Sequence, residues 1–545
     1  MRISETVGSR RATQPLQRTA DATAHAPRWA SERMKRVVLC VIGLIVFVSC
    51  SRTEPSGNTG TPVTDTGTTA PTHQPSANPP WYPSLAAFEA YNSVRTRLFS
   101  EATFGGDFAG NNTVESVQAP SSYPSGYNVV YFDADNIFWY GGGDGNEASS
   151  IGSYVAKTDP ATLKPIWYRQ LINTQQNGEW DYPGMIGLLD DGMLYVIYGY
   201  RLSKLDPKTG QVVATVTLPS GDAAPSNTAY NGFDASAEGI LVAKTIHRQA
   251  GCTVQGPDVL LKCPDSSDST MVSVDPRTMT IVDTVTLPSH VIGRPTVSRY
   301  QGKEYVYIFA ESGFIRYLIT PAGKLTLDSS WAAGPLLTSG QTIGWGAVVI
   351  GDWVLSQCNA LPGSAPASVY AVHQGDASKR FTIQPFANDP IPPLVKAAFR
   401  KQGPGGTQAI SFVSATLSAD PDTNLIYMFD ALPGKITCLR LTPSGFETVW
   451  TVSQATTEFT TIIGPRDRRV IVNTAIPGAE IPALNKHDEV VWRNAATGQE
   501  LARSERLPAI SNGTAVQPSY SGSVLYPGLE GALYKLVPAR PRPTG

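Results

Sequence analysis

Charged side chains are scarce in this sequence. Lys, Arg, Asp and Glu together make up 16% of the 545 residues, against roughly 25% in an average soluble protein. The formal net charge is -2, and the chain has no block of like charge. Binding to nucleic acid requires a basic surface that neutralises phosphates, so no nucleic acid partner is expected. Gly and Pro are plentiful instead, at 49 and 43 residues, which favours a chain with many turns.

The sequence also lacks an apolar run long enough for a stable membrane span. Val37–Val48 is apolar throughout, but as a helix it would extend only about 18 Å, less than the ~30 Å of a hydrocarbon core. Because Met34, Lys35 and Arg36 precede it, residues 34–49 are predicted to be a signal peptide. Residues 1–33 are polar and Arg-rich, and we interpret them as a non-native leader, with Met34 as the true start.

The apolar run ends in Val48-Ser49-Cys50. This tripeptide resembles the lipobox of bacterial lipoproteins, although Phe47 replaces the Leu usually found three positions before the cysteine. The resemblance implies that Cys50 is acylated and becomes the first residue of the mature chain. Lipid on Cys50 would hold the protein at the cell membrane, facing outside the cytoplasm. An ordinary secretory signal cleaved nearby is the alternative.

Residues 50–80 are predicted to form a lipidated cysteine followed by a disordered tether. From Ser51 to Pro80 the chain has eight Thr, six Pro, three Ser and three Gly, too few apolar groups to offset the loss of backbone entropy on folding. Order should resume at Trp81. Residues 81–124 are expected to form an opening segment with a short amphipathic helix, because Leu85, Phe88, Tyr91 and Leu98 recur at helical spacing.

The sequence has no adjacent pair of cysteines. Cys252 and Cys263 enclose a loop containing Gly and Pro, a spacing that fits a disulfide worth roughly 2 to 3 kcal/mol. Two unpaired thiols are the alternative. Parity alone suggests that Cys358 and Cys438 also pair in an oxidising compartment.

Beyond residue 125 one pattern recurs: an apolar strand, a polar turn and a second β-branched strand. The clearest copy spans Leu194–Leu218 and turns at Asp206-Pro207-Lys208-Thr209-Gly210, where Asp, Pro and Gly each favour a tight turn. Similar turns fall near residues 159, 206, 275, 320, 374, 442, 494 and 537, at spacings of 43 to 69 residues. Propeller repeats run about 40 to 50 residues. Residues 125–545 are therefore predicted to form an all-β fold, a single β-propeller of seven or eight four-stranded blades, with eight favoured.

The last repeat stops before its final strand, so an early strand such as Val129–Phe132 is expected to complete it and close the ring. The strings KLDPKTGQVV, SVDPRTMTIV and RNAATGQEL resemble the repeat of pyrroloquinoline quinone-type propellers. Quinone-dependent enzymes of that superfamily have a vicinal disulfide and a tryptophan in most repeats. Here only Trp167 and Trp450 end repeats well, so no cofactor is predicted.

The sequence contains no recognisable catalytic set. The histidines of the body show no zinc-binding spacing, and no metal site is predicted. If the propeller were an enzyme, His247, Arg248, His290 and Arg294 could gather in its central channel, as in arylsulfotransferases.

The sequence thus predicts an envelope-anchored lipoprotein whose propeller binds a small molecule or an envelope protein without catalysis. The alternative is an extracytoplasmic propeller enzyme, similar to arylsulfotransferases or to quinoproteins.

Overall fold

The computed structural model describes residues 78–143, 151–174, 179–252, 265, 267–360, 365–400, 416–478, 480–482, 485–510, 514–528 and 531–540. All of them lie in one compact unit, residues 72–545. The predicted leader, signal peptide, Cys50 and nearly all of the tether lie outside the described residues. No helix in the described part of the chain is long and apolar enough to cross a membrane.

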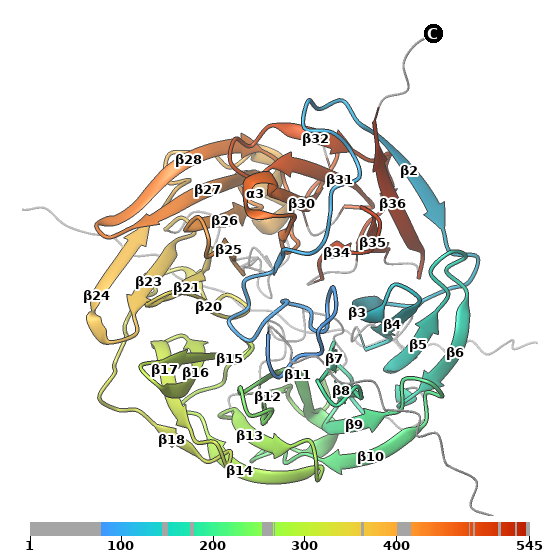
Figure 1. Cartoon of the computed structure of the whole chain (residues 1–545). Coiled ribbons are helices and arrows are strands. Elements are labelled where there is room, and N and C mark those ends of the chain that lie inside the picture. The colour runs from blue at the N-terminus through green and yellow to red at the C-terminus, as the bar shows by residue number, and fades with distance from the viewer. Residues whose placement is uncertain are drawn as a thin grey trace, which may run out of the picture. The chain divides into compact units, whose positions relative to one another are not determined.

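The described strands form eight blades around a common axis, and their order along the chain is their order around the ring (Figure 1). From the axis outward, blade 1 consists of β3 (Gly126–Asp133), β4 (Asn136–Gly141), β5 (Tyr154–Thr158) and β6 (Pro165–Gln170), and blade 2 of β7 (Met185–Leu188), β8 (Leu194–Tyr198), β9 (Arg201–Leu205) and β10 (Val212–Thr217). Blade 3 consists of β11 (Thr228–Ala235), β12 (Leu241–His247), β13 (Thr270–Asp275) and β14 (Thr280–Thr286). Blade 4 consists of β15 (Thr296–Tyr300), β16 (Lys303–Ala310), β17 (Gly313–Ile319) and β18 (Leu325–Leu327).

Blades 5 to 8 follow the same plan. Blade 5 consists of β20 (Val348–Ile350), β21 (Trp353–Gln357), β23 (Val369–His373) and β24 (Asp376–Ile383), and blade 6 of β25 (Ser418–Asp420), β26 (Leu425–Asp430), β27 (Lys435–Thr442) and β28 (Gly445–Ser453). Blade 7 consists of β29 (Thr461–Ile463), β30 (Val470–Ala475), β31 (His487–Asn494) and β32 (Glu500–Arg503). Blade 8 consists of β34 (Gln517–Pro518), β35 (Val524–Pro527), β36 (Leu533–Ala539) and β2 (Thr113–Gln118).

A few short elements supplement the blades. Strand β1 (Leu98–Phe99) pairs in parallel with β29, β33 (Leu507–Pro508) pairs with β31, and β19 (Gln341–Thr342) pairs with β22 (Asn359–Ala360). Helix α3 (Pro393–Arg400) follows blade 5, and two 3-10 helices, η1 (Pro225–Asn227) and η3 (Arg466–Arg468), lie in connections.

Burial explains why inner and outer strands differ in sequence. The inner strand β7 has the sequence MIGL and is buried at every position, whereas the outer strand β10 has the sequence VVATVT and is largely exposed. The strand β7 is covered by neighbouring blades on both faces, so all its residues are apolar or small. An outer strand contacts solvent along its edge and one face, which allows Thr to alternate with Val.

The predicted hairpins are confirmed. The turns near residues 159, 206, 275, 320, 374, 442 and 494 each join the third and fourth strands of blades 1 to 7. The eighth copy lies in β36, after which the chain supplies no further strand within the described residues. The prediction of an all-β propeller with eight blades therefore holds.

Ring closure uses a different strand from the one predicted. Val129–Phe132 lies in β3, the inner strand of blade 1, and blade 8 is completed by β2, antiparallel to β36. Figure 1 shows blue β2 beside dark red β36. The reason is burial: Val129 is fully buried and suits an inner strand, whereas β2 is exposed at most positions, as an outermost strand must be. The ring thus includes residues before 125.

Two tryptophans pack across the interfaces between adjacent blades. Trp167 of blade 1 lies against Gly210 in the turn of blade 2, where an added Cβ would come within 2.7 Å of the indole. Trp450 of blade 6 lies in the same way against Gly498 of blade 7, and its Nε1 donates a hydrogen bond to the Ala495 carbonyl at 2.9 Å. In both turns Gly gives the tryptophan room.

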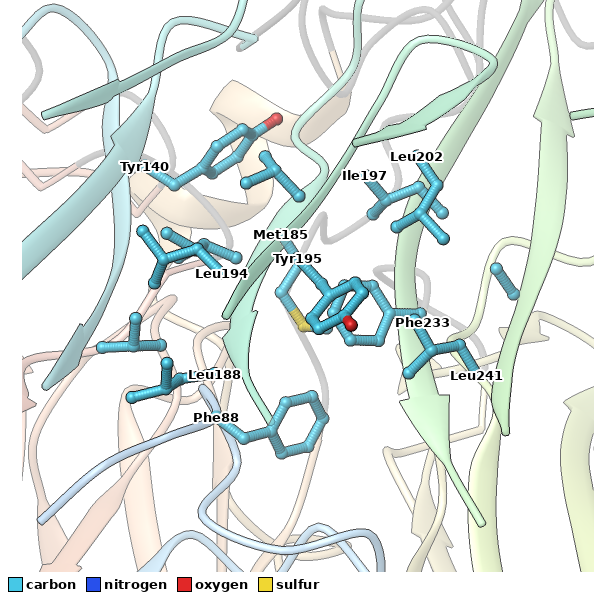
Figure 2. Close-up of a cluster of buried hydrophobic side chains, with 14 of the residues drawn as sticks. Phe88, Tyr140, Met185, Leu188, Leu194, Tyr195, Ile197, Leu202, Phe233 and Leu241 are labelled. Atoms are coloured by element: carbon cyan, nitrogen blue, oxygen red, sulfur yellow. The ribbon is translucent and has the colours of Figure 1, made fainter. Parts of the chain in front are cut away.

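The predicted amphipathic helix around Phe88 is wrong. Residues 81–99, which we call the strap, form turns and bends instead, with left-handed backbone at Tyr91, Arg95 and Arg97. A right-handed helix cannot contain such residues. Figure 2 shows Phe88 among apolar side chains of blades 1 to 3. Since the strap is surrounded by blades, its apolar residues need not share one face.

The predicted disulfide between Cys358 and Cys438 is also wrong. Both are buried free thiols. Cys358 packs in the apolar cluster shared by blades 4 and 5, and Cys438 packs in the cluster shared by blades 6 and 7. The two thiols therefore lie at different interfaces between blades. Cys263 lies outside the described residues, so its pairing with Cys252 stays a prediction.

Candidate functional site

The strap crosses the centre of the ring. Its backbone carbonyls accept hydrogen bonds from inner-strand amides of six blades, and the donors are Tyr131, Leu188, Val297, Val349, Ala419 and Ile462. On each inner strand the strap contact comes after the residues discussed below, such as Tyr127 before Tyr131 and Arg294 before Val297. The strap therefore forms a floor across the axis beneath those residues, which come earlier in their chain segments than the strap contacts.

Glu89 of the strap is the centre of a buried group of charges. Its carboxylate accepts hydrogen bonds from Arg95 of the strap and from Arg294, which precedes β15. Glu89 and both arginines are at most 3% exposed. Burial alone would raise the pKa of Glu89, but the charges of Arg294, Arg95 and Arg97 lower it to about 2. Glu89 is therefore ionised at neutral pH.

Tyr127 extends this group toward blade 1. Its hydroxyl accepts a hydrogen bond of 2.6 Å from Arg294 Nη2, and burial raises the pKa of the phenol to about 12 even though Arg294 opposes the shift. Tyr127 stays neutral and adds no negative charge to the cluster.

Asp234 and Lys244 of blade 3 border the cluster, and Asp234 Oδ2 lies 3.9 Å from Arg95 Nη1. Burial raises the pKa of Asp234 well above its ordinary value, against the effect of Arg95. Burial, helped by Arg294, lowers the pKa of Lys244 well below its ordinary value. Its Nζ donates to Asn231 Oδ1 at 3.1 Å and to two backbone carbonyls. Burial thus favours the neutral form of both groups.

The axis therefore holds more positive than negative charge. The guanidinium groups of Arg95, Arg97 and Arg294 face the ionised carboxylate of Glu89, and Arg95 also has the buried carboxyl of Asp234 at 3.9 Å. The Nε atoms of all three arginines are buried with no hydrogen-bond partner among the described residues. Arg97 lies 3.9 Å over the ring of Phe459, and burial lowers its pKa to about 10, so it remains charged at neutral pH. Buried N–H groups without acceptors call for a bound water or ion.

Aromatic side chains surround the axis on the side where the inner strands begin. Tyr182 and Trp345 lie nearly parallel, with ring centroids 6.2 Å apart, and Trp180 lies 5.7 Å from Tyr182. With Phe459 they belong to one buried apolar cluster that brings together blades 2, 3, 5, 7 and 8. The arginines thus have the strap on one side and an aromatic wall on the other.

The four residues predicted as channel residues lie in one sector of the ring, at blades 3 and 4. His247 and His290 have ring centroids 6.1 Å apart, and the His247 amide donates to His290 Nε2 at 3.4 Å. Arg248 lies over Trp180 at 5.3 Å. Among these four, only Arg294 takes part in the charged cluster.

Neither histidine is charged at neutral pH. Burial lowers the pKa of His247, and burial together with Lys244 lowers that of His290 to about 4. In the described part of the chain, no group of three or more histidine, cysteine, aspartate or glutamate side chains could hold a metal ion.

The sequence reasoning missed Glu89, Arg95 and Arg97. One signal was present: Arg95 and Arg97 are two positions apart, so a helix would point them in nearly opposite directions and could not keep one face apolar. Charged residues inside an otherwise apolar segment mark a buried polar cluster as readily as a surface helix.

No family model and no curated protein matches the sequence. Among solved structures, the chain is similar to a quinohemoprotein alcohol dehydrogenase from Comamonas testosteroni, with 12% identity, 84% of this chain and 82% of that chain covered, and a TM-score of 0.49. It is also similar to BamB from Moraxella catarrhalis, with 12% identity, coverage of 78% and 98%, and a TM-score of 0.44. A europium-containing methanol dehydrogenase has 9% identity, coverage of 82% and 88%, and a TM-score of 0.47.

Proposed function

We propose that this chain is a lipoprotein, held at the cell membrane outside the cytoplasm through Cys50, whose propeller binds an anionic ligand without transforming it. The ligand is a small molecule or an acidic group of an envelope protein. It binds at the axis, against the arginines of the strap and of blade 4.

One observation carries the binding proposal: three buried guanidinium groups face the ionised carboxylate of Glu89, with Asp234 3.9 Å from Arg95, and each guanidinium keeps an unpaired Nε–H. Removing a charge from water is unfavourable unless it is paired. An anion at the axis would supply the missing charge and acceptors, and arginine binds carboxylate and phosphate groups in a fixed geometry. The aromatic wall of Tyr182, Trp345 and Phe459 would exclude water from such a pair and strengthen it.

Native mass spectrometry tests this function. The full chain is extracted from native membranes in detergent, and the masses of molecules that remain bound are measured for wild type and for Arg97→Gln. We expect an anionic molecule or an acidic protein on the wild type and at least a tenfold lower occupancy on Arg97→Gln.

Arg316→Gln is the matched control. Arg316 is also a buried arginine, but it is paired with Asp328 in blade 4, away from the axis. This variant should keep the ligand. Equal occupancy in wild type and Arg97→Gln would refute a role of the axial arginines.

Turnover assays test the claim that no reaction follows binding. One observation favours an enzyme: the close pair His247 and His290, the latter only partly buried and uncharged at neutral pH. The purified chain is therefore incubated with aryl sulfates, and with alcohols plus a quinone acceptor. Turnover that His290→Asn abolishes would replace the binding proposal with an enzymatic one.

A further inference from the structure

A pocket of about 360 Å³ lies where the chain passes from blade 5 to blade 6. Its walls come from the segment between β21 and β23, from residues 386–391 after β24, from helix α3, and from the end of β26 and the turn that follows it. Pockets that bind small molecules commonly measure about 300–1,000 Å³. The pocket therefore has room for a small ligand of that class.

Most side chains that line the pocket are apolar. They include Pro366, Phe386, Ile391, Leu432 and Pro433. Phe386 and Leu432 are each only 2% exposed and belong to the buried apolar cluster shared by blades 5 and 6. Packing with the core therefore fixes this wall, which can cover the apolar part of a ligand.

Asp430, at the end of β26, adds a buried carboxylate to this apolar lining. The residue is only 5% exposed, and its Oδ1 accepts a hydrogen bond of 2.9 Å from the Leu432 amide. In the described part of the chain, Oδ2 accepts no hydrogen bond and no cation pairs with the carboxylate. Burial raises the pKa of Asp430 to about 6, so the group is ionised at neutral pH. A buried charge is unfavourable unless it is paired.

Two lysines lie near Asp430, and neither pairs with it. Lys435 is opposite Asp430 in the β26–β27 ladder, but its Nζ lies 3.4 Å from Asp389 Oδ1. Lys396 of α3 lines the pocket, yet it is exposed and makes no ion pair with any residue that the structure describes. An exposed ammonium keeps its water, whereas the buried carboxylate has lost most of its own. A ligand can therefore still supply the missing positive charge.

The free atoms of the pocket select one kind of cation. A guanidinium binds best when both carboxylate oxygens are available, and here the Leu432 amide already occupies Oδ1. A metal ion such as Ca²⁺ takes six to eight oxygen ligands, which an apolar lining does not offer. Asp389 is already paired with Lys435, so the pocket has no second free carboxylate for a diamine. An ammonium group needs only the single acceptor Oδ2.

We propose that this pocket binds a primary amine carried on a small apolar group. The ammonium donates to Asp430 Oδ2, and the apolar group packs on Phe386 and Leu432. The pocket shares no residue with the axial cluster of Glu89 and its arginines. Failure of either site therefore leaves the other untouched.

Titration calorimetry on the full chain tests the proposal with phenethylamine and its neutral counterpart 2-phenylethanol. We expect phenethylamine to bind at least tenfold more tightly than 2-phenylethanol. Asp430→Asn keeps an acceptor for the Leu432 amide and removes the charge, so it should weaken phenethylamine binding at least tenfold and leave 2-phenylethanol binding unchanged. Glu447→Gln, which removes an exposed carboxylate from β28 of blade 6, is the control and should bind phenethylamine like the wild type.

Thermal unfolding without ligand gives a second measurement. Because no group of the chain pairs with Asp430, Asp430→Asn should not lower the unfolding midpoint. A large fall would show that Lys396 or Lys435 pairs with this carboxylate in solution, and the proposal would be wrong. It would also be wrong if phenethylamine did not bind to the wild type, if it bound equally to Asp430→Asn, or if the diamine putrescine bound more tightly than phenethylamine.

Discussion

Replacement of Glu89 by Gln should destabilise the propeller strongly. Glu89 is an ionised carboxylate among three buried arginines, and its hydrogen bonds to Arg95 and Arg294 are charge-assisted. Its pKa of about 2, against 4.5 for an ordinary Glu, corresponds to about 3 kcal/mol of stabilisation at neutral pH, at about 1.4 kcal/mol for each pH unit. Breaking a buried ion pair by removing one partner generally costs about 3 to 5 kcal/mol. The value from the pKa shift and the general cost of breaking a buried ion pair are thus similar.

The pH dependence gives the same prediction an independent signature. Because folding lowers the pKa of Glu89, its contribution is fully present above pH 4.5 and is lost as the pH falls from about 4.5 to about 2. Glu89→Gln has no carboxyl to titrate. Its stability should therefore vary less with pH in that window than the stability of the wild type.

Urea denaturation followed by tryptophan fluorescence measures both effects. Glu101→Gln, which changes an exposed carboxylate just beyond the strap, is the control and should alter the free energy of unfolding by less than about 0.5 kcal/mol. A loss below about 1 kcal/mol in Glu89→Gln, with an unchanged pH profile, would show that the arginines at the axis do not depend on this carboxylate.

Three further outcomes follow. Gly498→Ala should lower the free energy of unfolding by about 2 to 3 kcal/mol, because its φ is +74° and the new Cβ would lie 2.8 Å from the Trp450 indole. The control Gly351→Ala, with φ of +52° and no atom within 4 Å of the new Cβ, should lower it by only about 1 kcal/mol. Equal losses in the two variants would argue against the tryptophan contact. Cys50→Ala should move the protein from the membrane fraction to the soluble one or leave an unprocessed precursor, and unchanged mass and lipid labelling would contradict lipidation. Deletion of Thr113–Gln118 should lower the thermal midpoint and cause association in size-exclusion chromatography, since the edge of blade 8 loses its cover; a monomer of unchanged midpoint would contradict closure by β2.

The blades could be predicted from the sequence because their signals are local. Each Asp-Pro or Thr-Gly turn fixes the backbone of a few residues, and the flanking strands alternate by burial, so hairpins such as β9 and β10 follow from about 25 consecutive residues. The number of turns, spaced 43 to 69 residues apart, then favoured eight blades over seven. The closing strand could not be found in this way. Both Val129–Phe132 and Thr113–Gln118 favour strands, and only the partner strand β36, more than 400 residues away in sequence, decides between them.

The axial site could not be predicted because its parts are distant in the chain and atypical for the segments that carry them. Arg294 was a candidate, but it was paired in the prediction with histidines of its own sector. Its actual partner is Glu89, 205 residues earlier. The apolar spacing of the strap is compatible with an amphipathic helix, but that prediction assumes one buried and one exposed face. The strap is buried on all sides inside the ring, so the assumption does not apply to it.

The strap is relevant to both parts of the proposed function, attachment to the membrane and binding of an anion. It begins at Trp81, directly after the predicted tether, and it carries Glu89, Arg95 and Arg97, three of the four members of the arginine–glutamate cluster at the axis. The remaining one, Arg294, comes from blade 4 and alone could not hold an anion in place. Because carbonyls of the strap accept hydrogen bonds from six blades, the strap is fixed only when the ring has formed around it. The site is therefore complete only in a closed ring with the strap inserted. An anion that binds there must stabilise the inserted state over any open one, in proportion to its affinity and concentration.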